Sequence, residues 1–384
     1  MSSAIFDLGP EQLRSRSSVK YQQYDADVLP LWVAEMDCAL APPIAARLTE
    51  AVRIGDTGYP TLDRQLPDAL AAYAAEHWAW EIDPAQVHPA PDVGVAVTEL
   101  LRHNISAGEK VVLCSPVYPP FYIWTSEVRS DLVDVPLLRG ADAWQLDFDG
   151  LRAAFAAGAR AFLLCNPANP VGRAWTRREL QAVAELAAEY DVLVIADEIH
   201  APLALAGSSF TPFLTVSDAA REVGVSVLAA SKGWNLAGLK CAQIVSAGKR
   251  AHDAVRRIHV HTFESAGHLG MLASIVAWKD GGPWLRQAVS ELSANRELLG
   301  ALVAEHLPEA RYIPPQATYL GWLDVSAYGW GDSPNRRILR DARVALNAGP
   351  RFGPQTGRGC VRVNFACSPA VLTEALRRIG ALAR

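Results

Sequence analysis

The sequence predicts an α/β protein with a mostly parallel sheet in a large domain and a smaller α+β domain. Between about residues 86 and 250, short continuous apolar runs alternate with segments of helical spacing, a pattern typical of buried parallel strands. After residue 250, long helical segments precede short strands. The 384 residues exceed the length, roughly 250–300 residues, at which a single core usually divides. We therefore expect a large domain over 46–280 and a small domain formed by 1–45 with 281–384.

The composition is that of an ordinary soluble protein. Half of the residues are hydrophobic, 20% are charged and the net charge is −5, which argues against nucleic acid as the main partner. No apolar stretch approaches the roughly 18 residues of a membrane helix, and residues 1–24 lack the apolar run of a signal peptide. The six cysteines are scattered and form no CxxC pair. This usage predicts reduced thiols and a cytoplasmic protein, with no membrane partner.

The elements can be assigned in chain order. Residues 1–45 are expected to form an irregular arm that includes the apolar, Trp-containing segment 28–37. In the large domain, apolar spacing predicts helices over 43–53, 66–80, 95–104, 148–157 and 176–189. Thr176 and Glu179 form a capping box at the start of the last of these helices. The strands expected between these helices are 110–114, 132–137, 161–165, 192–196, 225–229 and 241–246.

The remaining elements belong to the expected small domain or lead into it. Helical spacing predicts two long helices over 252–277 and 284–306, and a final helix over 369–382. Short apolar runs predict strands over 319–323, 344–346 and 360–365. No internal repeat or low-complexity segment is evident.

Lys232 stands where an apolar strand gives way to a loop, in Ala229-Ala230-Ser231-Lys232-Gly233. Burial disfavours the charged form of a lysine and lowers its pKa. An amine of this kind is what Schiff-base chemistry with a carbonyl cofactor requires. The alternative is an ordinary lysine in a surface loop.

Two further strand ends carry polar residues, and functional side chains of α/β sheets gather at such ends. Asp197 directly follows an apolar strand, with His200 three residues later. A buried carboxylate needs a partner, which would be a protonated cofactor nitrogen, a structural cation, or a metal shared with His200. Asn166 and Asn169 each precede a proline after strand 161–165. This doubled pattern predicts a stiff loop whose amides reach a ligand, the alternative being a plain turn.

Three positions suit the binding of anions. Gly94 precedes a helix, so the backbone N–H groups of Val95 and Ala96 could hold a phosphate, although such a glycine also fits a simple turn. Ser231 and Lys240 flank the candidate lysine loop and offer a hydroxyl and a second cation. Arg362 lies in an apolar strand, where its guanidinium needs either a substrate carboxylate or a structural Asp or Glu.

This ordered set of motifs resembles the fold-type I pyridoxal 5'-phosphate (PLP) enzymes of the class I/II aminotransferase superfamily, over nearly the whole chain. Within it, the chain is most similar to the carbon–sulfur lyase (cystathionine β-lyase) branch that includes MalY, PatB and cystalysin. The motifs that carry the resemblance are Leu31-Trp32-Val33-Ala34-Glu35-Met36-Asp37, Gly58-Tyr59-Pro60, Ser115-Pro116-Val117-Tyr118-Pro119-Pro120, Asn169-Pro170-Val171-Gly172, Asp197-Glu198-Ile199-His200, Ser231-Lys232-Gly233-Trp234-Asn235, Lys240 and Val361-Arg362-Val363-Asn364.

The resemblance implies the PLP-dependent transferase (aspartate aminotransferase-like) fold, and it assigns a role to individual residues. Lys232 would form the Schiff base with PLP and move protons at Cα, while Asp197 would pair with the ring nitrogen. The other implied contacts with PLP are Asn169 at the ring hydroxyl, Tyr118 stacked on the ring, His200 near it, and Val95, Ala96, Ser231 and Lys240 around the phosphate. Tyr59 would reach the phosphate of a neighbouring subunit, which implies a homodimer with shared sites. Arg362 would bind the substrate carboxylate, aided by the backbone at Val33 and Ala34.

The resemblance further implies a β-elimination on L-cystathionine or related cysteine S-conjugates, with Lys232, Tyr118 and Tyr59 as the catalytic residues and no metal. A class I/II aminotransferase that exchanges an amino group between an L-amino acid and a 2-oxo acid is the alternative, because it shares the same core motifs. A PLP-binding regulator fused to a DNA-binding module is a third interpretation, but the chain before the resembling segment is too short for such a module. Pro119 and the run Ala201-Pro202-Leu203 depart from the usual lyase pattern, which affects the identity of the substrate.

Overall fold

The computed structural model describes residues 4–383 and confirms the α/β prediction. Its main sheet has seven strands in the order β2-β10-β9-β8-β7-β3-β4. All neighbouring strands are parallel except at β10, which runs antiparallel to both β9 and β2. The strands are β2 (Val87–Ala90), β3 (Lys110–Leu113), β4 (Asp131–Asp134), β7 (Ala159–Cys165), β8 (Leu193–Asp197), β9 (Gly224–Leu228) and β10 (Ala242–Ser246).

Both faces of this sheet are buried, so its central strands are mainly apolar, with Ser226 in β9 and Asp197 at the end of β8 among the exceptions. On β7, Ala161 and Leu163 face one core while Phe162 and Leu164 face the other, as the two-residue period of a strand requires. The helices of this part of the chain are α3 (Pro42–Ile54), α4 (Gln65–Trp78), α5 (Val93–Asn104), α6 (Pro120–Glu127), α7 (Phe148–Ala156), α8 (Arg177–Glu189), α9 (Asp218–Val223), α10 (Lys249–Arg256), α11 (Val260–Glu264) and α12 (His268–Asp280).

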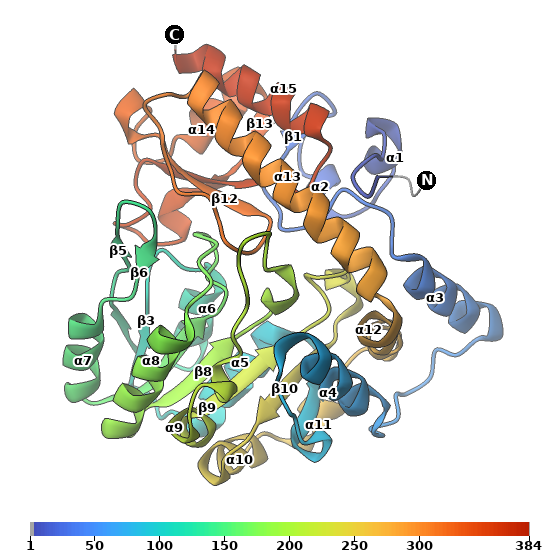
Figure 1. Ribbon diagram of the computed structural model, residues 1–384, viewed down its shortest axis with the longest axis vertical. Helices are drawn as coiled ribbons and strands as arrows, with labels where there is room; N and C mark the ends of the chain where they lie inside the picture. The colour runs from blue at the N-terminus through green and yellow to red at the C-terminus, as the bar shows by residue number, and fades with distance from the viewer. Residues whose placement is uncertain (1–3, 384) are drawn as a thin grey trace.

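A second, antiparallel sheet has the order β11-β12-β15-β14. Its strands are β11 (Arg311–Tyr312), β12 (Leu320–Asp324), β14 (Asn347–Ala348) and β15 (Cys360–Asn364), and it lies with α13 (Gly282–His306) and α15 (Pro369–Gly380) in the upper part of Figure 1. The N-terminal segment lies beside this part and includes α1 (Pro10–Arg14), α2 (Val19–Gln22) and β1 (Leu29–Pro30). β1 pairs in parallel with β13 (Val344–Ala345), which ties the arm to the C-terminal part of the chain.

Several elements differ from the sequence prediction: α1, α2, α6, α9, β11 and β14 were not assigned, and three further differences have a physical explanation. The prediction of a single helix over 252–277 is wrong, because the chain forms α10, α11 and α12 there, with turns between them. Gly270 packs so tightly on the loop before β10 that a Cβ atom would lie 2.2 Å from the Leu239 carbonyl oxygen. β2 was missed because it is short and contains Pro89, which is tolerated at a sheet edge. The strand expected over 132–137 ends at Asp134, whose carboxylate accepts from the Ser115 amide.

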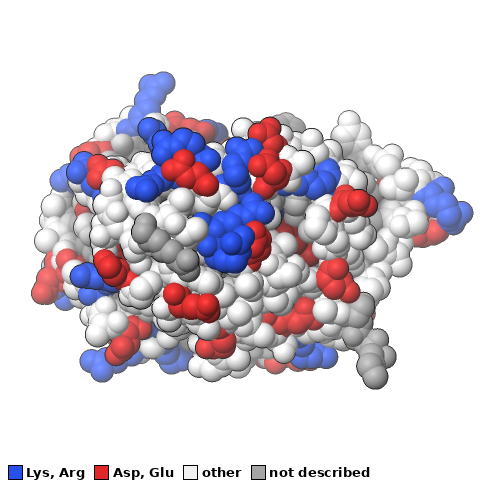
Figure 2. Space-filling view, turned by 90° about the horizontal axis from the view of Figure 1, so that it is seen from above, with Lys and Arg blue, Asp and Glu red and all other residues white. Residues whose placement is uncertain are grey.

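The surface seen from above in Figure 2 intersperses acidic and basic side chains over the same face. The charges therefore form mixed pairs rather than one broad basic field on this face. Among residues 4–383, no helix is long and apolar enough to cross a membrane.

Candidate active site

A cavity of about 560 Å³ lies at the carboxyl ends of the central strands. It is the place where parallel strands bring side chains from distant parts of the chain together. Ala34 of the arm also reaches this cavity. The predicted site residues that line it are Ala34, Val95, Tyr118, Asn169, Asp197, His200, Ser231, Lys232 and Lys240.

Lys232 enters the cavity from the loop after β9. Its Nζ atom donates a hydrogen bond of 2.9 Å to the main-chain carbonyl of Ala34. Burial, followed by the charge of the nearby Arg362 guanidinium, lowers the pKa of Lys232 to about 8, while Glu35 and Asp197 oppose the shift. An amine with this pKa is partly neutral near physiological pH, and can therefore act as a nucleophile or a base.

Asp197 ends β8 and is buried at the floor of the cavity. Its carboxylate accepts from the Ile199 amide at 3.2 Å. Burial raises the pKa of Asp197 to about 7, and the Ile199 hydrogen bond and the charge of Lys232 only partly offset this. Within residues 4–383, no cation lies within salt-bridge distance of Asp197. Its buried carboxylate therefore fits a positively charged ring nitrogen of a ligand.

His200 is buried beside Asp197, and its Nδ1 atom has no hydrogen-bond partner within residues 4–383. Burial, followed by the charges of Lys232 and Arg362, lowers the pKa of His200 well below its usual value. The ring is therefore neutral and presents an unused polar atom near the cavity. A metal shared with Asp197 is not supported, because no group of three metal-ligating side chains occurs in the described chain.

Arg362 projects from β15 and is buried, with 4% of its surface exposed. Its Nη1 atom donates to the Asn169 side-chain oxygen at 3.1 Å, and Nη2 donates to the Trp32 carbonyl at 2.9 Å. Burial lowers the pKa of Arg362 to about 10, and the other contributions come from Tyr118, Tyr319 and Arg351 rather than from a carboxylate. Arg362 therefore does not form a structural ion pair with a carboxylate of the described chain. Its positive charge is available to an anionic ligand.

The two asparagines of the loop after β7 have different surroundings. Asn169 lines the cavity and contacts Arg362. Asn166 instead donates to the Glu198 carboxylate at 2.8 Å and to the Thr211 carbonyl at 2.9 Å. Asn166 therefore fastens the loop to the protein interior, and of the two asparagines only Asn169 lines the cavity.

The expected phosphate region lies at the N-terminus of α5. Asp92 caps this helix: its carboxylate accepts from the Val95 amide at 2.8 Å and pairs with Lys240 at 2.6 Å. The Ala96 amide donates to the Asp92 carbonyl. A carboxylate held by a helix terminus and a lysine shows that this point favours anionic oxygens. The contribution of Asp92 was missed in the sequence because an N-cap aspartate has a purely structural use as well.

The remaining predicted residues have contrasting positions. Tyr118 faces the cavity, and burial raises the pKa of its hydroxyl. Val33 and Ala34 approach through carbonyl groups, which accept from Asn364 and from Lys232 respectively. Tyr59 is not brought to the cavity of its own chain and is fully exposed.

One further residue at the site was not predicted. The Tyr319 hydroxyl donates to the Ala34 carbonyl at 2.9 Å, the same oxygen that Lys232 contacts. In the sequence, Tyr319 is simply the first residue of the strand predicted over 319–323, and it belongs to no motif. Its role depends on a contact over a sequence separation of 285 residues, which no local pattern can predict.

Known proteins resemble this chain along its full length. The sequence profile of aminotransferase class I and II matches residues 27–379. A protein of Mycobacterium leprae (strain TN) that carries the provisional name cystathionine beta-lyase is 42% identical, over 99% of this chain and 98% of that protein. The cystathionine beta-lyase PatB of Bacillus subtilis (strain 168) is 34% identical, over 98% and 99% of the two chains.

A solved structure shows the same fold. The protein of Corynebacterium diphtheriae, provisionally named a PLP-dependent beta-cystathionase, has a TM-score of 0.92 at 34% identity, covering 99% of both chains. The predicted aspartate aminotransferase-like fold is thus confirmed. With a matching profile over most of its length and full-length relatives well above 30% identity, the chain belongs to the aminotransferase class I and II family.

Proposed function

We propose that this protein is a PLP-dependent carbon–sulfur β-lyase that converts L-cystathionine or related cysteine S-conjugates to pyruvate, ammonia and a thiol. The observation that carries the proposal is the cavity that holds the Lys232 amine, its pKa lowered to about 8, together with the buried carboxylate of Asp197. The names of the full-length relatives support the lyase outcome.

The residues of the cavity fit PLP. The buried Asp197 carboxylate would hold a protonated ring nitrogen, and Tyr118 and Asn169 would contact the ring. Ser231, Lys240 and the start of α5 would hold the phosphate, which would take the place of the Asp92 carboxylate at the Val95 amide and beside Lys240. The Ala96 amide already donates to the Asp92 carbonyl, so Ala96 would border the phosphate without a free N–H group. When bound, PLP withdraws electrons from the substrate Cα and thereby makes the Cα–H bond acidic.

The protein's own groups would then handle the substrate. The Arg362 guanidinium would bind the α-carboxylate, and the backbone at Val33 and Ala34 would border it. The Lys232 amine would accept the Cα proton and return a proton where the leaving group requires one. The neutral His200 would offer Nδ1 as an acceptor without adding a charge next to Lys232 and Arg362.

An aminotransferase is the second candidate, because the family includes both outcomes after the same Cα proton removal. The test incubates the purified protein with L-cystathionine, and in parallel with an L-amino acid plus a 2-oxo acid. We expect pyruvate, ammonia and thiol in equal amounts from the first reaction. Amino-group transfer without release of thiol or pyruvate would contradict the lyase proposal and leave the PLP site intact.

We also infer a homodimer that completes each active site with Tyr59 of the neighbouring subunit. The support is that four large apolar side chains within eleven residues of the sequence are exposed, namely Val52, Ile54, Tyr59 and Leu62. Exposed apolar side chains gathered in one region are typical of interaction surfaces. Sedimentation equilibrium is expected to give twice the mass of one chain, and a monomer that is fully active would contradict the inference. We further infer that the site lies between the domains 46–280 and 1–45 with 281–384, since Lys232 belongs to the first and Ala34 and Arg362 to the second.

The six cysteines are all buried and unpaired. Free thiols of this kind are typical of a reducing compartment, which supports a cytoplasmic location.

A further inference from the structure

The arm segment 32–37 reaches the cavity at Ala34 and does not belong to a sheet. Its carbonyl groups are nevertheless held by side chains, and we call this segment the strap. Trp32 accepts from Arg362 and Asn347, and Val33 accepts from Asn364. Ala34 accepts from Lys232 and Tyr319, Glu35 from Lys20 and Asn364, and Met36 from Asn235. Each of these five consecutive carbonyls therefore has a donor from another part of the chain.

The strap is fastened to the loop of the candidate catalytic lysine at two points. Ala34 contacts Lys232 itself, and two residues later Met36 is clasped by the Asn235 amide. The Met36 N–H donates to the Asn235 oxygen at 2.9 Å, and the Asn235 nitrogen donates to the Met36 carbonyl at 3.0 Å. Because Asn235 lies three residues after Lys232, the strap is joined to the lysine loop at both of these points.

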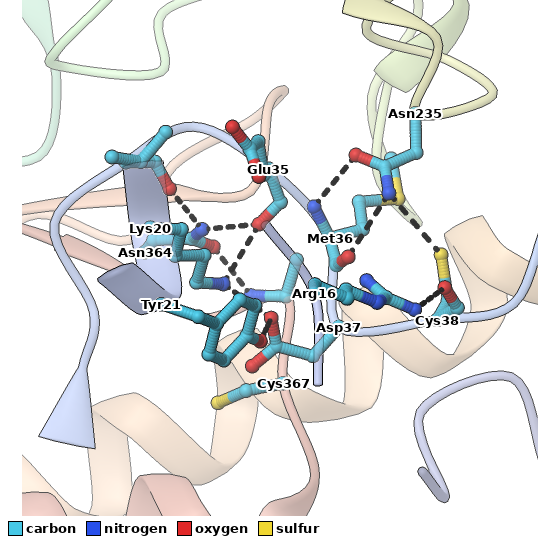
Figure 3. A network of polar contacts seen from close by, with 12 residues as sticks. Arg16, Lys20, Tyr21, Glu35, Met36, Asp37, Cys38, Asn235, Asn364 and Cys367 are labelled. Carbon is cyan, nitrogen blue, oxygen red and sulfur yellow. Dashed lines mark hydrogen bonds and ion pairs between the residues drawn. The ribbon is translucent and has the colours of Figure 1, made fainter. Parts of the chain in front are cut away.

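A buried ion pair anchors the strap from the other side, as Figure 3 shows. Lys20 is 1% exposed and Asp37 is 4% exposed, and the two side chains form a salt bridge that the Tyr21 hydroxyl also joins. Lys20 Nζ additionally donates to the Glu35 carbonyl at 3.0 Å. Two buried charges are costly to desolvate, and a buried pair gives little net stability compared with apolar residues of the same size. A role in fixing the position of the strap therefore explains the buried pair Lys20–Asp37 better than a gain in stability does.

We propose that Lys20 and Asp37 are positioning residues for the catalytic lysine: they fix the strap so that the Ala34 carbonyl stands as a hydrogen-bond acceptor for the Lys232 amine. The inference rests on the proposed function of Lys232. During the reaction, Lys232 gains the Cα proton, and the ammonium formed needs an acceptor inside a partly desolvated cavity. The Ala34 carbonyl, held in place by Tyr319 and the anchored strap, supplies that acceptor while leaving the amine directed into the cavity.

Other charges also act on Lys232, and the test must separate them from the carbonyl. Arg362 and Lys240 disfavour the ammonium, whereas Glu35 and Asp197 favour it. Lys232 in turn acts on the neighbouring His200, which is neutral. Of these groups, only Glu35 belongs to the strap, so its charge requires a variant of its own.

The test is the double variant Lys20→Met/Asp37→Asn, which removes both buried charges together and keeps the side-chain volumes similar. Removing only one partner would leave an unpaired buried charge and risk unfolding. In the PLP-loaded enzyme, kcat is expected to fall between about 10- and 100-fold, as for a displaced catalytic group. The acid limb of the kcat–pH profile is expected to move to lower pH by about one unit, because the ammonium loses a charge-assisted hydrogen bond. Hydrogen exchange measured by mass spectrometry is expected to be faster in peptides that cover the strap.

Two matched controls accompany this variant. Arg343→Gln/Asp27→Asn removes an exposed ion pair that fastens the same arm without touching the strap, and it is expected to leave the pH profile unchanged. Glu35→Gln removes only the charge, and is expected to reproduce less than half of the shift. Should the first double variant fail to fold, Asn235→Gly releases the Met36 clasp and tolerates the left-handed backbone of Asn235 (φ 58°); it is expected to shift the limb in the same direction.

Several results would overturn the proposal. An active, PLP-loaded double variant with an unmoved acid limb and unchanged exchange in the strap would show that Lys20 and Asp37 are purely structural. A full shift in Glu35→Gln would assign the effect to that carboxylate rather than to the Ala34 carbonyl. Failure of the proposed function itself would look different, because the wild-type protein would then release no thiol from L-cystathionine, whether or not it binds PLP.

Discussion

Replacing Lys232 by alanine is expected to lower the rate of thiol release from L-cystathionine by at least about 10³-fold, because the variant lacks both the amine that binds the cofactor and the group that accepts the Cα proton. The visible absorbance of the bound cofactor is expected to change as well, since the lysine no longer bonds to it. Initial rates and absorbance spectra of the purified variant give the measurement.

Lys240→Ala is the matched control for this loss. Lys240 lies in the same cavity but is exposed, and it pairs with Asp92 rather than reaching the Ala34 carbonyl. Its removal is expected to weaken cofactor binding by about tenfold and leave kcat at saturating cofactor within a few-fold of wild type. Added methylamine is expected to restore part of the rate of Lys232→Ala and none to Lys240→Ala. A Lys232→Ala variant within tenfold of the wild-type rate would contradict its assignment as the base.

Replacing Asp197 by asparagine is expected to lower kcat by about 10²–10³-fold, because a neutral amide no longer favours a protonated ring nitrogen in the buried site. Glu198→Gln is the matched control, since Glu198 is also buried with its pKa raised to about 7 by burial, but it binds Asn166 and the Phe213 amide instead of facing the cavity. The control is expected to leave the cofactor spectrum unchanged. An equal loss in both variants would show that burial of a carboxylate, rather than its contact with the cofactor, matters.

The same Asp197→Asn substitution is expected to stabilise the cofactor-free protein. The pKa of Asp197 is raised from 3.8 to about 7 by burial, so the folded state binds this proton more tightly than the unfolded state does. The contribution of Asp197 to stability is therefore greatest below pH 3.8 and falls as the pH rises towards 7. Thermal unfolding should show a higher Tm for the variant above pH 7 and no difference below pH 3.8. A lower Tm above pH 7 would contradict the account of a buried, unpaired charge.

The polar residues at the strand ends could be predicted because each of them follows closely on an apolar run that itself predicts a strand. Asp197 follows four apolar residues of β8, and Lys232 follows β9 closely, so their meeting at one sheet edge needs only a parallel arrangement. Arg362 could be singled out because a guanidinium in an apolar strand is unusual. The structure adds that the partner of Arg362 is the amide of Asn169, not a carboxylate.

The parts that could not be predicted depend on contacts between distant segments. In the sequence, the strap is an irregular apolar run without a marked motif. Its proposed function depends on main-chain carbonyl groups, which every residue carries. Lys20 looks like an ordinary arm lysine until Asp37 is found beside it in the interior. The break of 252–277 into three helices involves a contact with a distant segment: Gly267, the N-cap of α12, donates its N–H to the Lys240 carbonyl. Hydrophobic periodicity does not report such a contact.

The most direct test of the central claim is to locate the cofactor on the chain. The purified protein is treated with borohydride, which fixes a lysine-bound carbonyl cofactor irreversibly, then digested and examined by mass spectrometry. We predict a PLP adduct on the Lys232 side chain, located by fragmentation of its peptide, and none on the side chains of Lys20 or Lys240. An adduct on either of those lysines instead, or no adduct in a protein supplied with PLP, would contradict the assignment of Lys232 as the residue on which this site is built.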